Sequence, residues 1–364
     1  MQSYEMRMIA IQKQMAEQQV SHLILGPSAN LFYLTGLSPM PDERLQLLIL
    51  PVQGKPALVL PELYRTMVQE SGGNWELYTW GDGQPPEQAL KKLLTGVTKA
   101  AVDEQLWAMH LLQLLPFLQK AQLLEASQVV GEVRMHKDPQ ELQLLKKAAE
   151  LADAVVPWVI PQLHEGITEK EVAFLIERCM REAGAEGISF RPVVGFGPGS
   201  ADPHHSASDL PLQKGQMIVM DFGCKWHGYC SDMTRTICFG RATEEMRHVY
   251  ETVLAANRAG FAAAQLGVPC EEVDAAARKV ITDAGYGEYF IHRTGHGLGL
   301  DDHEETYIVS GNRRPLEEGL VFSIEPGIYL PGKFGVRIED IAAMTEKGVW
   351  CLNECPRELI EVEL

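Results

Sequence analysis

The stretch Met220–Thr236, M-D-F-G-C-K-W-H-G-Y-C-S-D-M-T-R-T, decides how the second half of this 364-residue chain is expected to fold. It continues an apolar run that begins at Met217 and is typical of a buried strand, and it then turns back through Lys225–Gly228. A hairpin centred on the middle of that loop would place Asp221 directly opposite Asp232, with Cβ atoms roughly 4.5–5.5 Å apart. Two carboxylates at so short a distance, beside a hydrophobic strand, repel each other unless a cation lies between them. The hairpin therefore predicts a divalent-metal site.

A second hairpin pattern follows later in the chain. Leu320–Glu325 (L-V-F-S-I-E) is typical of a strand that ends in a carboxylate, and Gly335–Ile341 (G-V-R-I-E-D-I) carries another carboxylate. A turn midway between these strands would make Glu325 and Glu339 cross-strand partners, although Pro326-Gly327 lies between them and can shift this register. Burying four uncompensated carboxylates is prohibitive, whereas two divalent cations offset four negative charges. The two hairpins together predict two metal ions.

A histidine and two further strand residues complete this pattern. His296 lies in the glycine-rich loop R-T-G-H-G-L-G. One histidine and four carboxylates, with no thiolate, suit manganese, cobalt or ferrous iron better than a structural zinc ion. Two such cations lower the pKa of a water that they share, which indicates hydrolysis. By strand alternation, Thr234 shares a face with Asp232, although Thr234 is equally consistent with simple strand packing. Arg337 likewise shares a face with Glu339 and would orient its carboxylate.

The first half of the chain alternates short strands and helices, which favours a compact α/β domain. Residues 128–136 are expected to form a polar connector, so we predict one domain over residues 1–130 and a second over residues 131–364. The first domain is expected to contain strands at 21–26, 47–50, 57–60, 76–80 and 100–103, and helices at 1–20, 62–69, 86–94 and 107–118.

The second half repeats one order of elements: two helices, a strand, a glycine-rich loop with histidine, and a carboxylate hairpin. Asp138-Pro139 is a typical N-cap, and Thr168 with Glu171 forms a capping box. This order favours an internal pseudo-repeat. The helices are expected at 138–160, 168–183, 244–264 and 271–283, and the strands before the glycine-rich loops at 188–195 and 289–293.

Composition narrows the class of protein. The net charge of −17 provides no basic surplus for nucleic acid or an anionic membrane. The seven cysteines form no C-x-x-C pair and are odd in number, as expected for reduced thiols in a cytosolic protein. We find neither a signal-peptide pattern nor an apolar run long enough to span a bilayer, so a cytoplasmic location is expected. The motifs G-x-S-x-G, Walker A and H-E-x-x-H do not occur.

Four motifs, in order, carry a family resemblance. M-D-F-G-x(6)-C-S-D-M-T-R-T, H-R-T-G-H-G-L-G-L-D-D-H-E-E, S-I-E-P-G-I-Y and G-V-R-I-E-D-I together resemble the pita-bread metallopeptidases, and among them the Xaa-Pro peptidases prolidase and aminopeptidase P. The resemblance implies an α+β fold, with a pita-bread catalytic domain preceded by a smaller α/β creatinase-type N-terminal domain. It also implies a homodimer.

The resemblance assigns roles to particular residues of this chain. It implies that the ligands of two divalent metal ions, foremost Mn²⁺ with Co²⁺, Fe²⁺ or Zn²⁺ as alternatives, are Asp221, Asp232, His296, Glu325 and Glu339. It further implies that His204 in D-P-H-H and His303 in D-D-H-E-E line the substrate pocket, with His205 the weaker candidate of the adjacent pair. Glu325 is the ligand best placed to shuttle a proton, and Arg337 is expected in the catalytic site beside the ligands. This chain reads H-E-E-T-Y where family members often have a proline, which can alter the pocket wall beside His303.

The expected function is hydrolysis of the Xaa-Pro bond of dipeptides, as in prolidase, which the modest length favours. The alternative is an Xaa-Pro aminopeptidase that acts on longer peptides. A creatinase-like hydrolase without metals, or a non-catalytic binding protein on the same fold, would be expected to lack ligand residues, and this sequence retains all five.

Overall fold

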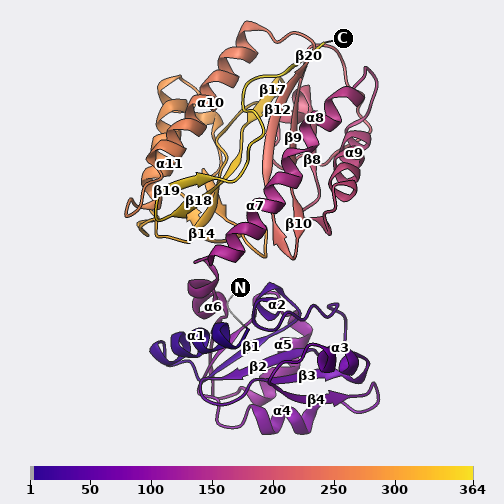
Figure 1. The fold of residues 1–364 in the computed structure, drawn as a ribbon, viewed down its shortest axis with the longest axis vertical. Coiled ribbons are helices and arrows are strands. Elements are labelled where there is room, and N and C mark those ends of the chain that lie inside the picture. Colours follow the sequence, from indigo (N-terminus) through magenta and orange to yellow (C-terminus); the bar gives the residue numbers. More distant parts are fainter. Residues whose placement is uncertain (1–3, 364) are drawn as a thin grey trace. The chain divides into compact units, whose positions relative to one another are not determined.

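The computed structural model describes residues 4–363 and divides into two compact units, the first ending at Arg134 and the second beginning at Met135 (Figure 1). The first unit contains a six-stranded mixed sheet in the order β4-β3-β2-β1-β5-β6. Strands β1, β5 and β6 run parallel, as do β3 and β4, whereas β2 is antiparallel to both β1 and β3. The strands are β1 (His22–Leu25), β2 (Leu47–Pro51), β3 (Ala57–Pro61), β4 (Glu76–Trp80), β5 (Lys99–Val102) and β6 (Gln122–Glu125).

The helices of the first unit are α1 (Tyr4–Glu17), α2 (Ala29–Thr35), α3 (Arg65–Glu70), α4 (Glu87–Leu93), α5 (Ala108–Leu114) and α6 (Ser127–Arg134). The five predicted strands and four predicted helices are confirmed with shifted ends, although residues 1–3 of the first helix lie outside the described residues. The prediction of a polar connector at 128–136 was wrong, because most of this segment forms helix α6. The reason is that Val129 and Val130 are fully buried, and Arg134 donates to Asn30 Oδ1 at 2.6 Å within the same unit.

The second unit begins with capped helices, as the sequence predicts. Asp138 caps α7 (Pro139–Asp153), and Thr168 caps α9 (Glu169–Glu182), each in a reciprocal capping box. The first helix is shorter than expected, because it stops at Asp153 and a separate α8 (Val155–Val159) follows. Pro157 explains the break, since its ring clashes with the carbonyl four residues earlier and it has no N–H to donate.

Four strand groups form the rest of the second unit. A four-stranded sheet has the order β20-β12-β9-β8, and a five-stranded sheet has the order β14-β13-β15-β18-β19. The smaller groups are β11-β10-β7 and β16-β17. The strands are β7 (Gly187–Ile188), β8 (Val193–Phe196), β9 (Gln216–Phe222), β10 (Cys224–Trp226), β11 (Tyr229–Cys230), β12 (Met233–Phe239), β13 (Gly295–Gly297), β14 (Glu304–Ile308), β15 (Val321–Ile324), β16 (Gly327–Leu330), β17 (Phe334–Arg337), β18 (Asp340–Thr345), β19 (Gly348–Cys351) and β20 (Glu361–Val362).

Two helix pairs flank these strands. In Figure 1, α8 and α9 lie on one side of β8, β9 and β12, and α10 (Glu244–Ala263) and α11 (Cys270–Asp283) lie on the other side. Each pair has its own apolar core: the first packs Val172 and Ile176 with Met220, and the second packs Val253 with Ile328. None of the described helices is long and apolar enough to cross a membrane.

Two strand predictions before the glycine-rich loops need correction. The single strand expected at 188–195 is two short strands, β7 and β8. Residues 289–293 form no strand, because a 3₁₀ turn at Gly287–Tyr289 precedes an irregular segment. That segment is held instead by Arg278, which donates to the carbonyl oxygens of Phe290 and His292 at 3.0 and 2.8 Å.

The register predicted for the first hairpin was wrong by one residue at its centre. The turn is His227-Gly228, with φ of 48° and 80°, and Trp226 pairs with Tyr229. Two successive positive φ values are typical of the type I′ turn that matches strand twist, which is why the loop is tighter than expected. Asp221 consequently faces Thr234, and Asp232 lies outside the ladder, just before β12.

The register predicted for the second hairpin is confirmed. Ile324 pairs with Asp340 on one side of the interruption, and Gly327 pairs with Arg337 on the other side. Glu325 and Glu339 occupy the matching positions between these two ladders, outside any strand. Both hairpins therefore break their ladders near their carboxylates, which frees the backbone there from strict alternation.

Candidate metal centre

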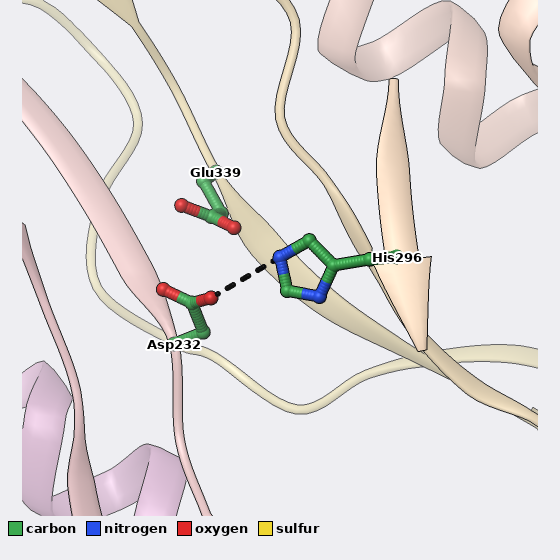
Figure 2. A group of neighbouring side chains, drawn as sticks. All are labelled: Asp232, His296 and Glu339. Carbon is green, nitrogen blue, oxygen red and sulfur yellow. Dashed lines mark ion pairs between the residues drawn. The ribbon is translucent and has the colours of Figure 1, made fainter. Parts of the chain in front are cut away.

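Three of the predicted ligands converge from separate strands. Asp232 precedes β12, His296 lies in β13 and Glu339 precedes β18 (Figure 2). One potential ligand atom from each lies within 4.8 Å of the others, and all three residues are buried. His296 Nε2 lies 3.5 Å from Asp232 Oδ2, the contact drawn as a dashed line in Figure 2.

The other two predicted ligands lie in the same cavity. Glu325 Oε1 lies 3.4 Å from His296 Nε2 and accepts a hydrogen bond from the Ser323 hydroxyl at 3.2 Å. Asp221, near the end of β9, lines this cavity as well. The structure thus brings all five residues together, even though the first hairpin has a different register from the predicted one.

The tautomer of His296 suits a cation between these groups. Its Nδ1 lies 3.0 Å from the carbonyl oxygen of Gly297, which can only accept, so Nδ1 carries the proton. Nε2 is then a bare lone pair directed at Asp232 and Glu325, an arrangement that is repulsive unless a proton or a cation lies between them. Burial and the neighbouring His303 lower the pKa of His296 to about 3, which keeps the ring neutral.

Unpaired carboxylate oxygens provide the direct test of whether metal ions fit. Among residues 4–363, the buried oxygens Asp221 Oδ1, Asp232 Oδ1 and Glu339 Oε1 accept no hydrogen bond. A buried polar atom without a partner is costly, and a charged one more so. Carboxylate oxygens with a neutral imidazole are also a suitable donor set for hard or borderline divalent cations. The residues present therefore fit divalent metal ions.

The pKa values of the carboxylic acids in this cluster are strongly shifted. Burial raises the pKa of Asp232 and of Glu339 well above the ordinary range, and the neighbouring carboxylates raise both further. Burial also raises the pKa of Glu325 to about 7. Like charges packed this tightly need either protons or cations.

Arg337 orients a different ligand from the one predicted. Its Nη2 donates to Asp221 Oδ2 at 2.6 Å, whereas it reaches Glu339 only through the Thr234 hydroxyl. Thr234 accepts from Arg337 Nε at 2.9 Å and donates to Glu339 Oε2 at 2.7 Å, so its hydroxyl contributes more than strand packing. The expected contact with Glu339 is absent because Arg337 ends β17, before the ladder breaks, and β17 packs beside β9.

The ligands open onto a cavity of about 620 Å³, within the roughly 300–1,000 Å³ typical of small-molecule sites. His204 and His303 both line it, as predicted. The ring of His303 stacks on His296 with centroids 3.8 Å apart, and its Nδ1 accepts from Arg293 at 2.9 Å. Its Nε2 therefore carries a proton, which it can donate to a bound oxygen. His205 does not line the cavity.

Sequence reasoning missed several residues of this site, and four of them have contacts or positions that matter for its chemistry. Phe190, His292 and Arg293 line the cavity, and the Tyr329 hydroxyl joins His292 Nε2 at 2.8 Å to Arg337 Nη1 at 2.9 Å. The signal was present for three of them, because H-R-T-G-H begins with His292 and Arg293 and S-I-E-P-G-I-Y ends with Tyr329. No pattern pointed to Phe190.

Comparisons with known proteins agree with this geometry. The model of metallopeptidase family M24 matches residues 143–346, and that of the creatinase/prolidase N-terminal domain matches residues 7–136. A protein of Mycobacterium bovis named "Probable dipeptidase PepE" is 42% identical over 95% of this chain and 93% of its own length.

Solved structures agree as well. A prolidase from Thermococcus sibiricus is 40% identical and superposes with a TM-score of 0.95 over 99% of this chain and 100% of that one. Dipeptidase PepE from Mycobacterium ulcerans, also 40% identical, gives a TM-score of 0.92 over 99% and 98%. The fold is accordingly a pita-bread catalytic domain preceded by a creatinase-type N-terminal domain. The chain belongs to metallopeptidase family M24 and is a metallopeptidase.

Proposed function

We propose that this protein is a dinuclear metal-dependent dipeptidase that hydrolyses the Xaa-Pro bond, and that five residues hold its two cations. The observation that carries the proposal is the buried cluster of Asp232, Glu339 and the neutral His296, in a cavity where Asp221, Asp232 and Glu339 each have a buried carboxylate oxygen that accepts no hydrogen bond among the described residues. Relatives named dipeptidase and prolidase support the reaction class. Mn²⁺ is the metal we expect first, with Co²⁺, Fe²⁺ and Zn²⁺ as alternatives. The proposed ligands are Asp221, Asp232, His296, Glu325 and Glu339.

When bound, the cations supply Lewis acidity and activate water. The chain's own residues would do the rest. Glu325 can take a proton from the attacking water and return it to the leaving amine. His303 Nε2–H and the His204 ring face the same cavity and can donate to the oxygen that becomes negative in the transition state. Arg337 orients Asp221, and its charge opposes the rise that burial causes in the pKa of Asp221.

The cavity wall supports a dipeptide substrate. Phe190, Val193 and Pro203 provide an apolar surface suited to a proline ring. Arg293 is half-buried in the same wall, where its guanidinium can pair with the free carboxylate that follows proline in a dipeptide. A longer peptide has an amide at that position and cannot form this pair. The second candidate, an Xaa-Pro aminopeptidase, requires that Arg293 contribute little to binding.

The substrate test compares Ala-Pro, Ala-Ala, Ala-Pro-amide and Ala-Pro-Ala with the Mn²⁺-loaded enzyme. We expect the highest kcat/KM for Ala-Pro, and a rise in its KM of roughly tenfold or more in Arg293→Met, as for loss of a charge-assisted hydrogen bond. The KM for Ala-Pro-amide should respond little, because this substrate has no free carboxylate, whereas a loss of kcat shared by both substrates would come from the lost Arg293–His303 hydrogen bond. Arg313→Met, at an 87% exposed side chain, is the matched control. Efficient cleavage of Ala-Pro-Ala, unchanged by Arg293→Met, would favour the aminopeptidase.

The metal test measures bound metal and Ala-Pro hydrolysis in Asp232→Ala and His296→Ala. Wild type should bind two equivalents of Mn²⁺ per chain, and each variant should lose both metal and activity. Full metal content and full activity in both variants would refute the ligand assignment. Tight binding of a single equivalent with full activity would refute the dinuclear site.

Two broader predictions remain part of the proposal. A homodimer is supported by a group of exposed apolar side chains on the first unit, and light scattering at micromolar concentration tests it. A cytoplasmic location is supported by the seven cysteines, none of which forms a disulfide within the described residues, and cell fractionation tests it. The exposed side chains are Trp107, Met109, Leu112, Leu115 and Leu123.

A further inference from the structure

A carboxylate outside the metal cluster closes the loop that carries His204. Glu169 is the first residue of α9, and its side chain is 0% exposed. Its Oε1 accepts from the backbone N–H of Phe196 at 2.9 Å, where the loop begins. Its Oε2 accepts from the backbone N–H and the hydroxyl of Ser208, at 2.9 and 2.7 Å, where the loop ends. One buried carboxylate therefore joins both ends of the segment 196–208.

The Glu169 carboxylate also bonds to His205, which is the neighbour of His204 in the sequence. Its Nε2 donates to Glu169 Oε2 at 2.8 Å, and its side chain is 17% exposed. The adjacent His204 side chain is exposed and faces the substrate cavity. Because neighbouring residues share one peptide unit, fixing His205 restricts the backbone from which His204 projects. Burial alone would raise the pKa of Glu169, but the hydrogen bonds from His205 and Ser208 outweigh it and lower that pKa.

The surroundings of this carboxylate leave little freedom. A Cβ atom at Gly199 would lie 3.1 Å from Glu169 Oε1 and 3.2 Å from His205 Cε1, so the loop backbone packs directly on the pair. The middle of the loop is held from the opposite side, where the Ser200 hydroxyl accepts from the Gly335 N–H at 2.8 Å. Glu169 does not line the substrate cavity. Its contacts are therefore with the loop rather than with a substrate or metal.

We propose that Glu169, together with His205, is a positioning device that sets the placement of His204 over the substrate carbonyl. The inference rests on the proposed function, because it assumes that His204 acts on bound peptide. Glu169 touches no reacting atom, so it acts through His204 alone. Removing its charge should loosen the loop and lower kcat roughly 10–100-fold, the cost of misplacing a catalytic group by about 1 Å. KM should change much less.

A double-mutant cycle separates positioning from general structural support. We would measure kcat for Ala-Pro in Glu169→Gln, in His204→Ala and in the double variant, with metal content determined for each. If Glu169 acts through His204, its substitution costs nothing more once His204 is gone. Losses that multiply in the double variant would overturn the proposal. Glu171→Gln is the control, since this carboxylate caps the same helix and, within the part of the chain that the structure describes, accepts hydrogen bonds from Thr168 alone.

Hydrogen exchange of the metal-free protein supplies a readout that does not depend on activity. The amides of residues 197–207 should exchange faster in Glu169→Gln than in wild type, with no such change in Glu171→Gln. Unchanged exchange would overturn the proposal. If Glu169→Gln does not fold, His205→Ala with Ser208→Ala removes both side-chain hydrogen bonds to Oε2, leaves the Ser208 N–H contact in place, and must still reproduce both effects. Failure of wild type to cleave any Xaa-Pro peptide would refute the proposed function and would leave the exchange result to decide the role of Glu169 in the loop.

Discussion

Arg337→Met should destabilise the metal-free enzyme far more than loss of a surface arginine. Arg337 is 3% exposed and donates to Asp221, Thr234 and the Tyr329 hydroxyl. Methionine preserves much of the volume but leaves the Asp221 carboxylate buried without its cation. Removing one partner of a buried ion pair costs about 3–5 kcal/mol. Protonation limits that cost, since neutralising an aspartate of ordinary pKa at pH 7 requires about 4 kcal/mol.

Urea unfolding at pH 7 in EDTA measures this loss. The control is Arg178→Met, because Arg178 pairs with Glu182 on the surface at 2.7 Å, and an exposed pair contributes about 0–1 kcal/mol. At saturating Mn²⁺ the penalty of Arg337→Met should shrink, since bound cations would supply positive charge beside Asp221. Equal losses for the two variants in EDTA, or a penalty that grows with Mn²⁺, would refute this reasoning.

Three further predictions follow from burial and backbone geometry. Burial raises the pKa of Glu325 from 4.5 to about 7, so the native metal-free state retains a proton that the unfolded chain releases. The free energy of unfolding in EDTA should therefore fall by up to about 3 kcal/mol as pH rises from 4.5 to 7. Glu325→Gln should flatten that slope in urea titrations at a series of pH values. Lys137 pairs with Glu304 at 3.0 Å, and the two side chains are 1% and 8% exposed. Lys137→Met should therefore cost about 3–5 kcal/mol in urea unfolding, against at most about 1 kcal/mol for the exposed Lys147→Met. Similar losses for the two variants would contradict the role of this pair. Gly228 has φ of 80°, so Gly228→Ala should cost about 1 kcal/mol by thermal unfolding, and an unchanged Tm would argue against the type I′ turn.

The contrast between the two hairpins shows where sequence reasoning succeeds. For the second hairpin, a turn centred on Gly332 in P-G-K-F predicts the observed register, and the interruption near Glu325 leaves that register unchanged. For the first hairpin, treating Lys225–Gly228 as a four-residue loop placed the centre one residue too early. The H-G dipeptide was the available signal, since histidine tolerates positive φ better than most residues and glycine adopts it freely.

The site shows a similar division. Its five proposed ligands were predictable because carboxylates inside apolar strands need a compensating charge wherever they lie. Their partners were not, because alternation along a strand predicts a shared face but not which neighbouring strand supplies the contact. Arg337 therefore bonds to Asp221 on β9 rather than to Glu339, two residues away in its own sequence.

The sequence by itself determined the family, the catalytic fold and the set of acids that must share a cavity, since these depend on residue type and spacing along the chain. Only the tertiary structure decided how the acids are oriented and what positions the substrate-facing histidines. The contact of Glu169 with His205 joins residues that are distant in sequence. The contact of Arg293 with His303 depends on the packing of an irregular loop. Side-chain hydrogen bonds across such loops follow no period, so only the folded chain reveals them.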